Sequence, residues 1–209
     1  GYGASCGMQK SRLNDTILGW FHRRFASRHS PLLARRGPSD HVIILDGTMS
    51  TLRPGCETNA GLTYQLLREV GHSKNMTLFY ESGIQWRDWR SSWDIVVGRG
   101  INKQIRRAYG ALSSRYRPGD QIVLIGYSRG AYAVRSLAGV IDQVGLLQAQ
   151  YATERNIRQI YRLYRYAPQG RSAQAFGQLY CHEDAPIEMV GVWDTVKALG
   201  LRFPVLWRG

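Results

Sequence analysis

The hydrophobic residues of the chain fall into two kinds of stretch that alternate along the sequence. Short, largely apolar runs, which we predict to be strands, lie at residues 41–45, 76–80, 121–126 and 187–193. Stretches with apolar residues at every third or fourth position, which we predict to be helices, lie at residues 59–70, 101–116, 129–144 and 153–166. Continuous apolar runs are typical of strands that are buried on both faces. Their alternation with helices predicts an α/β fold with a doubly wound, mainly parallel sheet.

One predicted strand and the helix after it meet at a short turn that contains Ser128. The turn reads Gly126-Tyr127-Ser128-Arg129-Gly130, which matches the G-x-S-x-G pattern of a nucleophile elbow. Both glycines are needed because a Cβ there would collide with the neighbouring strand or helix, and the strained turn exposes the serine Oγ. Ser128 is therefore the predicted nucleophile, and the N–H of Arg129 is predicted to stabilise an oxyanion. The alternative is an ordinary turn with an exposed serine.

Two other predicted strands end at polar residues, and in a parallel sheet these ends share an edge with Ser128. The first strand ends at Asp46-Gly47-Thr48. The loop after the corresponding strand of α/β-hydrolases supplies the second oxyanion N–H, so Gly47 or Thr48 is the predicted donor. The alternative is that Asp46 only ties down its own turn. The last strand is followed by Asp194, which we predict to orient a catalytic histidine. The alternative is that Asp194 caps a turn.

Composition and charge narrow the class of protein and its partners. The chain has 209 residues, of which 44% are hydrophobic and 21% charged, as in a globular protein with a sizeable core. Its net charge of +13 favours an anionic partner, such as a phospholipid surface, a nucleic acid or an acidic protein. No nucleic-acid-binding motif accompanies the charge, so nucleic acid is the disfavoured partner. A solvated basic face is the alternative.

The sequence also carries expectations about compartment and cofactors. No apolar run approaches the roughly 20 residues of a transmembrane helix, and no hydrophobic signal core precedes the first strand. We therefore expect a cytoplasmic protein or one exported by a non-classical secretion system. The three cysteines, Cys6, Cys56 and Cys181, lack zinc-binding spacing, so we expect free thiols, no metal and no cofactor.

Two further regions lie outside the predicted sheet. Residues 1–40 form a basic N-terminal extension to a catalytic domain at residues 41–209. A short helix capped by Asn14 or Asp15 would either lie on an anionic membrane or pack on that domain. Residues 82–100 interleave Trp86, Trp89 and Trp93 with arginines, and we interpret them as a lipid-facing rim or as a packed insertion.

Four blocks of the sequence together resemble one protein family. They are Leu45-Asp46-Gly47-Thr48, Tyr116-Arg117-Pro118-Gly119-Asp120, Gly126-Tyr127-Ser128-Arg129-Gly130-Ala131-Tyr132, and Gly191-Val192-Trp193-Asp194-Thr195-Val196 with Gly200. Over residues 41–202 their order and spacing resemble the α/β-hydrolase family of uncharacterised proteins that includes the type VI secretion phospholipase effectors. The resemblance implies a lipase-type hydrolase of phospholipid or another ester, with a Ser-Asp-His triad in which Ser128 and Asp194 match the family's motif positions. Residues 80–86 depart from the Y-x-x-G-V-G-T pattern of many members, so they leave the substrate rim unassigned.

The triad histidine is missing from its expected place, since no histidine follows Asp194. His41 and His182 precede the strands that end at Asp46 and Asp194, so we expect them near the opposite edge of the sheet, roughly 20 Å away. We therefore expect this chain to be the N-terminal part of a longer protein whose histidine lies downstream of residue 209. A pseudoenzyme or a non-catalytic binding module that keeps the fold is the alternative.

Overall fold

The computed structural model describes residues 37–47, 50–71, 75–83 and 93–193. Its strands are β1 (Asp40–Leu45), β2 (Met76–Glu81), β3 (Gln121–Tyr127) and β4 (Ile187–Trp193). Its helices are α2 (Asn59–Gly71), α3 (Trp93–Ser113), α4 (Arg129–Gln143), α5 (Glu154–Tyr166) and α6 (Arg171–Tyr180), with a short 3-10 helix η2 (Ala149–Tyr151). The four strands and four helices predicted from residue 41 onward are present, and the bounds of all but α3 lie within one residue of the prediction. The helix predicted after Asn14 lies outside the described residues.

The four strands form one sheet in the order β2-β1-β3-β4, and every neighbouring pair is parallel. The chain passes from β1 to β2 on one side and later returns to β3 on the other side of β1. The connections after β1 and β3 therefore run in opposite directions. Such a switch point leaves a crevice at the carboxyl ends of the two strands, where open α/β sheets bind their ligands. The predicted α/β fold with a mainly parallel sheet is confirmed in the described residues.

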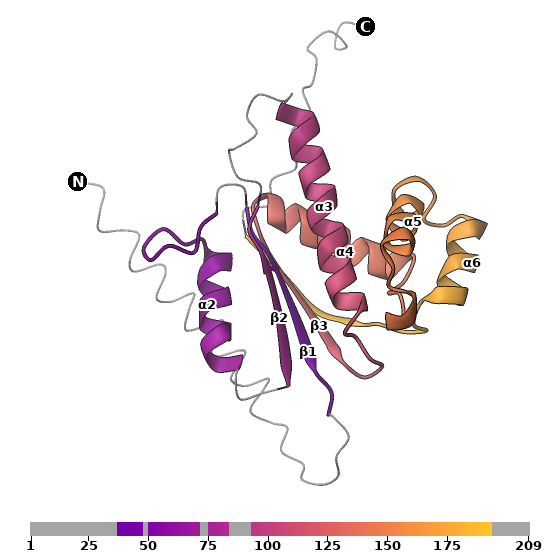
Figure 1. Ribbon diagram of the computed structural model, residues 1–209, viewed down its shortest axis with the longest axis horizontal. Helices are drawn as coiled ribbons and strands as arrows, with labels where there is room; N and C mark the ends of the chain where they lie inside the picture. The colour runs from indigo at the N-terminus through magenta and orange to yellow at the C-terminus, as the bar shows by residue number, and fades with distance from the viewer. Residues whose placement is uncertain (1–36, 48–49, 72–74, 84–92, 194–209) are drawn as a thin grey trace, which may run out of the picture.

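Helices cover both faces of this sheet (Figure 1). Alternate residues of a strand point to opposite faces, so Val42 and Ile44 of β1 belong to the core beneath α2, whereas Ile43 and Leu45 belong to the core beneath α3 and α4. Helix α5 packs outside α3 and α4, and α6 packs against α5. None of the described helices has the length and apolar character needed to span a membrane.

Helix α3 differs most from the prediction, because it begins at Trp93 and not at residue 101. The glycines and β-branched residues between positions 95 and 100 have low helix propensity. For this reason the sequence did not predict the first two turns of α3. The contacts of α3 with α4, β1 and β2 outweigh those local preferences. The region interpreted as a rim or insertion is therefore helical from Trp93 onward. Helix α6 was not predicted, because among its ten residues only Ala173 is fully buried.

Strand β4 lies at an edge of the sheet, since among the described strands it pairs with β3 alone. Its residues alternate between half-buried and exposed. The prediction that this strand is buried on both faces is therefore wrong, because in the described part of the chain no element covers its outer face. Val190 and Val192, whose register partners are Leu124 and Gly126 of β3, are 41% and 39% exposed. In the described residues, one face of this strand therefore carries uncovered apolar side chains.

Several predictions fall on residues that the structure does not describe. They concern the basic extension up to residue 36, the tryptophans Trp86 and Trp89, and the site residues Thr48 and Asp194. The roles predicted for these residues stay predictions.

Candidate active site

Ser128 lies in a strained turn at the carboxyl end of β3, immediately before α4. Its backbone angles are φ 55° and ψ −118°, and it is the one non-glycine residue with a positive φ in the described part of the chain. A residue with a side chain in such a conformation costs on the order of 1–3 kcal/mol, so the surrounding structure must hold it there. Because β3 borders the switch point, the turn places Ser128 at the crevice between β1 and β3.

Two glycines make this turn possible, because backbone atoms fill the space where their side chains would be. A Cβ on Gly126 would lie 2.6 Å from the Cα of Ala131. A Cβ on Gly130 would lie 2.0 Å from the carbonyl oxygen of Leu45. The first turn of α4 therefore rests directly on the end of β1. Both glycines have the steric role that the sequence pattern predicted.

The amino end of α4 brings backbone N–H groups beside Ser128. The first N–H groups of a helix have no partner within the helix, and the Ser128 side chain makes no capping hydrogen bond. The aligned peptide dipoles of this 15-residue helix add positive potential at the same end. The N–H of Arg129, the first residue of the helix, belongs to this group and stays the predicted oxyanion donor.

Asp46 is a fully buried carboxylate at the end of β1 that ties neighbouring loops together. Its oxygens accept hydrogen bonds from the Gly47 N–H at 2.7 Å, from the Thr58 hydroxyl at 2.7 and 2.9 Å, and from the Tyr80 hydroxyl at 2.8 Å. Burial, together with the bonded Asp46, raises the pKa of Tyr80 well above its usual value, so the phenol stays a donor. Sequence reasoning missed Thr58 and Tyr80, because no local signal ties them to Asp46.

Gly47 lies against the Ser128 turn, but its N–H points elsewhere. A Cβ on Gly47 would lie 3.1 Å from the Cβ of Ser128, so the two backbones are close. The Gly47 N–H donates to Asp46 at 2.7 Å, and its carbonyl oxygen accepts from the N–H groups of Ser50 at 3.3 Å and Gly83 at 3.1 Å. Both polar groups of this residue are therefore occupied. Thr48, the other predicted donor, lies outside the described residues.

Asp194, the predicted triad acid, follows the last described residue of β4. That residue, Trp193, accepts a hydrogen bond through its carbonyl oxygen from the backbone N–H of Ser128, at 2.9 Å. Strands β3 and β4 are paired up to Tyr127 and Trp193. Trp193, the residue immediately before Asp194, is therefore hydrogen-bonded to the backbone of the Ser128 turn.

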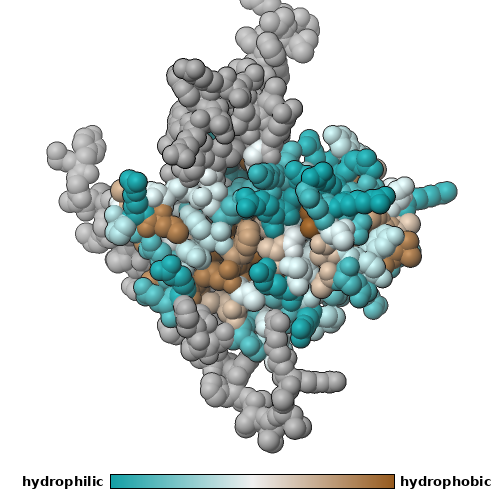
Figure 2. Space-filling view, viewed as in Figure 1, coloured by the Kyte–Doolittle hydropathy of each residue, from teal (hydrophilic) through white to brown (hydrophobic). Residues whose placement is uncertain are grey.

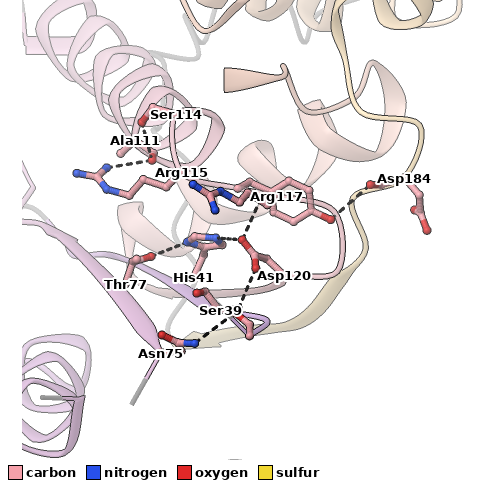
Figure 3. Close-up of polar contacts among 12 residues, drawn as sticks. Ser39, His41, Asn75, Thr77, Ala111, Ser114, Arg115, Arg117, Asp120 and Asp184 are labelled. Carbon is pink, nitrogen blue, oxygen red and sulfur yellow. Dashed lines mark hydrogen bonds and ion pairs between the residues drawn. The ribbon is translucent and has the colours of Figure 1, made fainter. Parts of the chain in front are cut away.

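His41 lies at the opposite edge of the sheet from Ser128. It stands in register with Ile122 of β3, six residues before Ser128, which corresponds to roughly 20 Å along a strand. Its Nε2 is bonded to Asp120 at 2.8 Å and its Nδ1 to Thr77 at 2.5 Å (Figure 3). The predicted position of His41 at the edge of the sheet opposite Ser128 is confirmed. Both nitrogens of its ring are hydrogen-bonded to residues at that far edge.

His182 belongs to the same far edge. Its ring packs edge-on against Tyr116, with centroids 5.0 Å apart, and it lines a hollow there together with Asp120. Burial lowers the pKa of His182, so its imidazole is neutral at neutral pH. His22, His29 and His72 lie outside the described residues. The described part of the chain thus holds no histidine within reach of Ser128, as the sequence predicted.

Comparison with known families matches residues 40–208 to the family described as T6SS phospholipase effector Tle1-like, catalytic domain. The chain belongs to this family. The resemblance carried by the four sequence blocks is therefore confirmed. The description of this family names phospholipase effectors and their catalytic domain.

The chain is also similar to a curated protein whose name states no activity. The uncharacterised protein YEL023C of Saccharomyces cerevisiae is 27% identical over 197 residues, which cover 78% of this chain and 28% of the yeast protein. The chain therefore spans less than a third of that relative's length. No solved structure matches the chain, so the finer identification of an α/β-hydrolase fold stays a prediction.

Proposed function

We propose that this Tle1-like domain is a serine-nucleophile phospholipase in which Ser128 attacks the ester and Asp194 orients the triad histidine. The observation that carries the proposal is the turn at Ser128, a positive-φ serine between a buried parallel strand and the amino end of a helix. Family membership supplies the substrate class, phospholipid. The base in this proposal is a histidine downstream of residue 209, because the chain order of α/β-hydrolases is Ser, Asp, His. The two described histidines, His41 and His182, lie at the far edge of the sheet.

The reaction begins when Ser128 Oγ bonds to the ester carbonyl carbon and its proton passes to the histidine. Negative charge then develops on the carbonyl oxygen, and we assign its stabilisation to the N–H groups of Arg129 and Thr48. Gly47 is not assigned this role because its N–H donates to Asp46. The leaving alcohol takes the proton from the histidine, and an acyl-enzyme remains. Water, deprotonated by the same histidine, then releases the fatty acid and restores Ser128.

Labelling with a fluorophosphonate probe, which reacts with activated serines, tests the nucleophile. The full-length protein should be labelled, and Ser128→Ala should not. Ser114→Ala is the matched control, because Ser114 is an exposed serine just after α3 and should not affect labelling. Release of fatty acid from phospholipid vesicles should fall at least about a thousandfold in Ser128→Ala.

Two results would contradict the proposal. Labelling that persists in Ser128→Ala would refute the assignment of the nucleophile. A folded full-length protein that is neither labelled nor active on phospholipid would make a non-catalytic binding module the better account.

A further inference from the structure

Helices α3 and α5 lie side by side and together carry a dense set of cations. The set comprises Lys103, Arg106 and Arg107 of α3, with Arg155, Arg158, Arg162 and Arg165 of α5, and all but the half-buried Arg106 are exposed. We call these seven residues the α3–α5 basic surface. Figure 2 shows the hydrophilic patch that they help to form over α5 and its junction with α3. Two carboxylates face it, Glu81 paired with Arg107 and Glu154 paired with Arg158, so cations remain in clear excess.

The packing of α5 does not explain its arginines. Ile160 and Leu163 are buried, and the hydroxyl of Tyr161 donates to Asn102 of α3 at 2.7 Å. The arginines are exposed and follow one another at three- and four-residue spacing, where like charges repel and weaken a helix. A face that served solubility alone would mix both signs of charge. An anionic ligand would relieve the repulsion.

A groove between the two helices is large enough for a lipid headgroup. Its volume is about 510 Å³, and its lining consists of Lys103, Arg106, Arg107, Gly110, Glu154, Ile157 and Arg158. Arg158 also lines a second hollow of about 390 Å³ with Arg155 and Arg162. Guanidinium groups bind phosphate oxygens through paired N–H donors, which makes phosphate the best-fitting ligand chemistry.

The basic surface reaches the sheet edge on which Ser128 lies. Gln104 of α3 donates to the carbonyl oxygens of Asp46 at 3.5 Å and Glu81 at 3.3 Å, at the ends of β1 and β2. Lys103 and Arg107 are within one turn of Gln104 on the same helix. Cations of this surface therefore stand beside the carboxyl ends of the strands, where the candidate nucleophile is held.

The opposite edge of the molecule carries acidic groups. A hollow there is lined by Asp120, Glu183, Asp184 and Glu188. Two exposed arginines, Arg115 and Arg117, lie near these carboxylates. An anionic surface would therefore attract the α3–α5 basic surface, where cations are in excess, more strongly than this edge, and so would orient the molecule as well as bind it. The resulting orientation brings the Ser128 edge of the sheet toward the anionic surface.

We propose that the α3–α5 basic surface docks this domain on anionic phospholipid headgroups. An apolar group beside the charges favours a membrane over a nucleic acid: Tyr166, at the end of α5, is 77% exposed, and Arg165 lies over its ring at 5.7 Å. Tyrosine is enriched at the headgroup level of membranes, where basic residues also bind anionic lipid. This inference rests on the proposed function, because the role of docking would be to bring the phospholipid substrate to Ser128.

Vesicle sedimentation with the full-length Ser128→Ala protein tests docking without hydrolysis. Vesicles of phosphatidylcholine with phosphatidylglycerol should bind, vesicles of phosphatidylcholine alone should not, and added salt should release the protein. Adding Arg158→Gln and Arg162→Gln should weaken binding roughly 30-fold. The matched control, Arg115→Gln with Arg117→Gln, removes equal charge from exposed residues near the far edge and should change binding less than about threefold (Figure 3).

Three results of the binding experiments would overturn the docking proposal. They are an equal loss of binding in both arginine pairs, equal binding to neutral vesicles, and tighter binding of duplex DNA than of anionic vesicles at equal phosphate concentration. Failure of docking and failure of the catalytic proposal are distinguishable with a soluble short-chain ester. In the protein that retains Ser128, Arg158→Gln with Arg162→Gln should leave hydrolysis of that ester unchanged and lower hydrolysis of vesicles. Vesicle binding lost without any change in vesicle hydrolysis would also refute docking.

Discussion

Replacing Gly130 by alanine tests the idea that the Ser128 turn is held by direct backbone contact between α4 and β1. The added Cβ would lie 2.0 Å from the carbonyl oxygen of Leu45 and 2.7 Å from that of Asp46. Both oxygens belong to the backbone and cannot rotate away as a side chain could, so the first turn of α4 and the end of β1 must move apart. Gly130→Ala should therefore destabilise the protein.

The expected size of the effect follows from two opposing contributions. Alanine is favoured over glycine in a helix by up to about 1 kcal/mol, so without a clash the substitution would stabilise α4. Overpacking a rigid site costs about 1–3 kcal/mol and occasionally more, and a backbone contact at this distance belongs at the upper end. We expect a net loss of about 2–3 kcal/mol of unfolding free energy. For a domain of this size the melting temperature should fall by about 4–12 °C.

Urea denaturation followed by circular dichroism measures the change, and Gly110→Ala is the matched control. Gly110 lies in the interior of α3, and its added Cβ would meet only the Cδ1 of Ile157, at 2.9 Å. That methyl group can move, so Gly110→Ala should be close to neutral. If the unfolding free energies of Gly130→Ala and Gly110→Ala agree within about 0.5 kcal/mol, the backbone contact between α4 and β1 does not hold the Ser128 turn.

Two further predictions concern ionisable groups. Asp120→Asn should lower the unfolding free energy at neutral pH by about 2–3 kcal/mol, because the carboxylate accepts two backbone N–H bonds and one bond from His41. Burial alone would raise the pKa of Asp120, but these hydrogen bonds bring it below its usual value. The parent protein should therefore have its full excess of unfolding free energy over Asp120→Asn above about pH 4, and should lose it as the pH falls through the lowered pKa. Urea unfolding at a series of pH values measures this difference. A difference that grows in acid would contradict the prediction. Burial also raises the pKa of Cys181 to about 12, so a thiol reagent at mildly alkaline pH should modify the exposed Cys56 in the folded protein and Cys181 only after unfolding. Mass spectrometry that finds both modified at equal rates would refute this expectation.

Local patterns determined the elements and the candidate nucleophile. Residues 122–125 indicate a buried strand because four apolar residues follow one another there. The turn at Ser128 follows from two glycines that are required for steric reasons. The reason is that periodicity and backbone sterics act over a few residues, so they can be read from adjacent positions. The same patterns did not predict the start of α3, because residues 95–100 have low helix propensity and yet belong to a helix that packs on α4, β1 and β2.

The tertiary structure alone decided which groups surround that turn. The carboxylate of Asp46 meets Thr58 and Tyr80, 12 and 34 residues away in the sequence, and it draws the Gly47 N–H away from the serine. The α3–α5 basic surface likewise joins two helices whose arginines are far apart in the chain, as the pairing of Tyr161 with Asn102 across 59 residues illustrates. Burial and strand order create such neighbours, and neither is encoded in the spacing of residues along one segment.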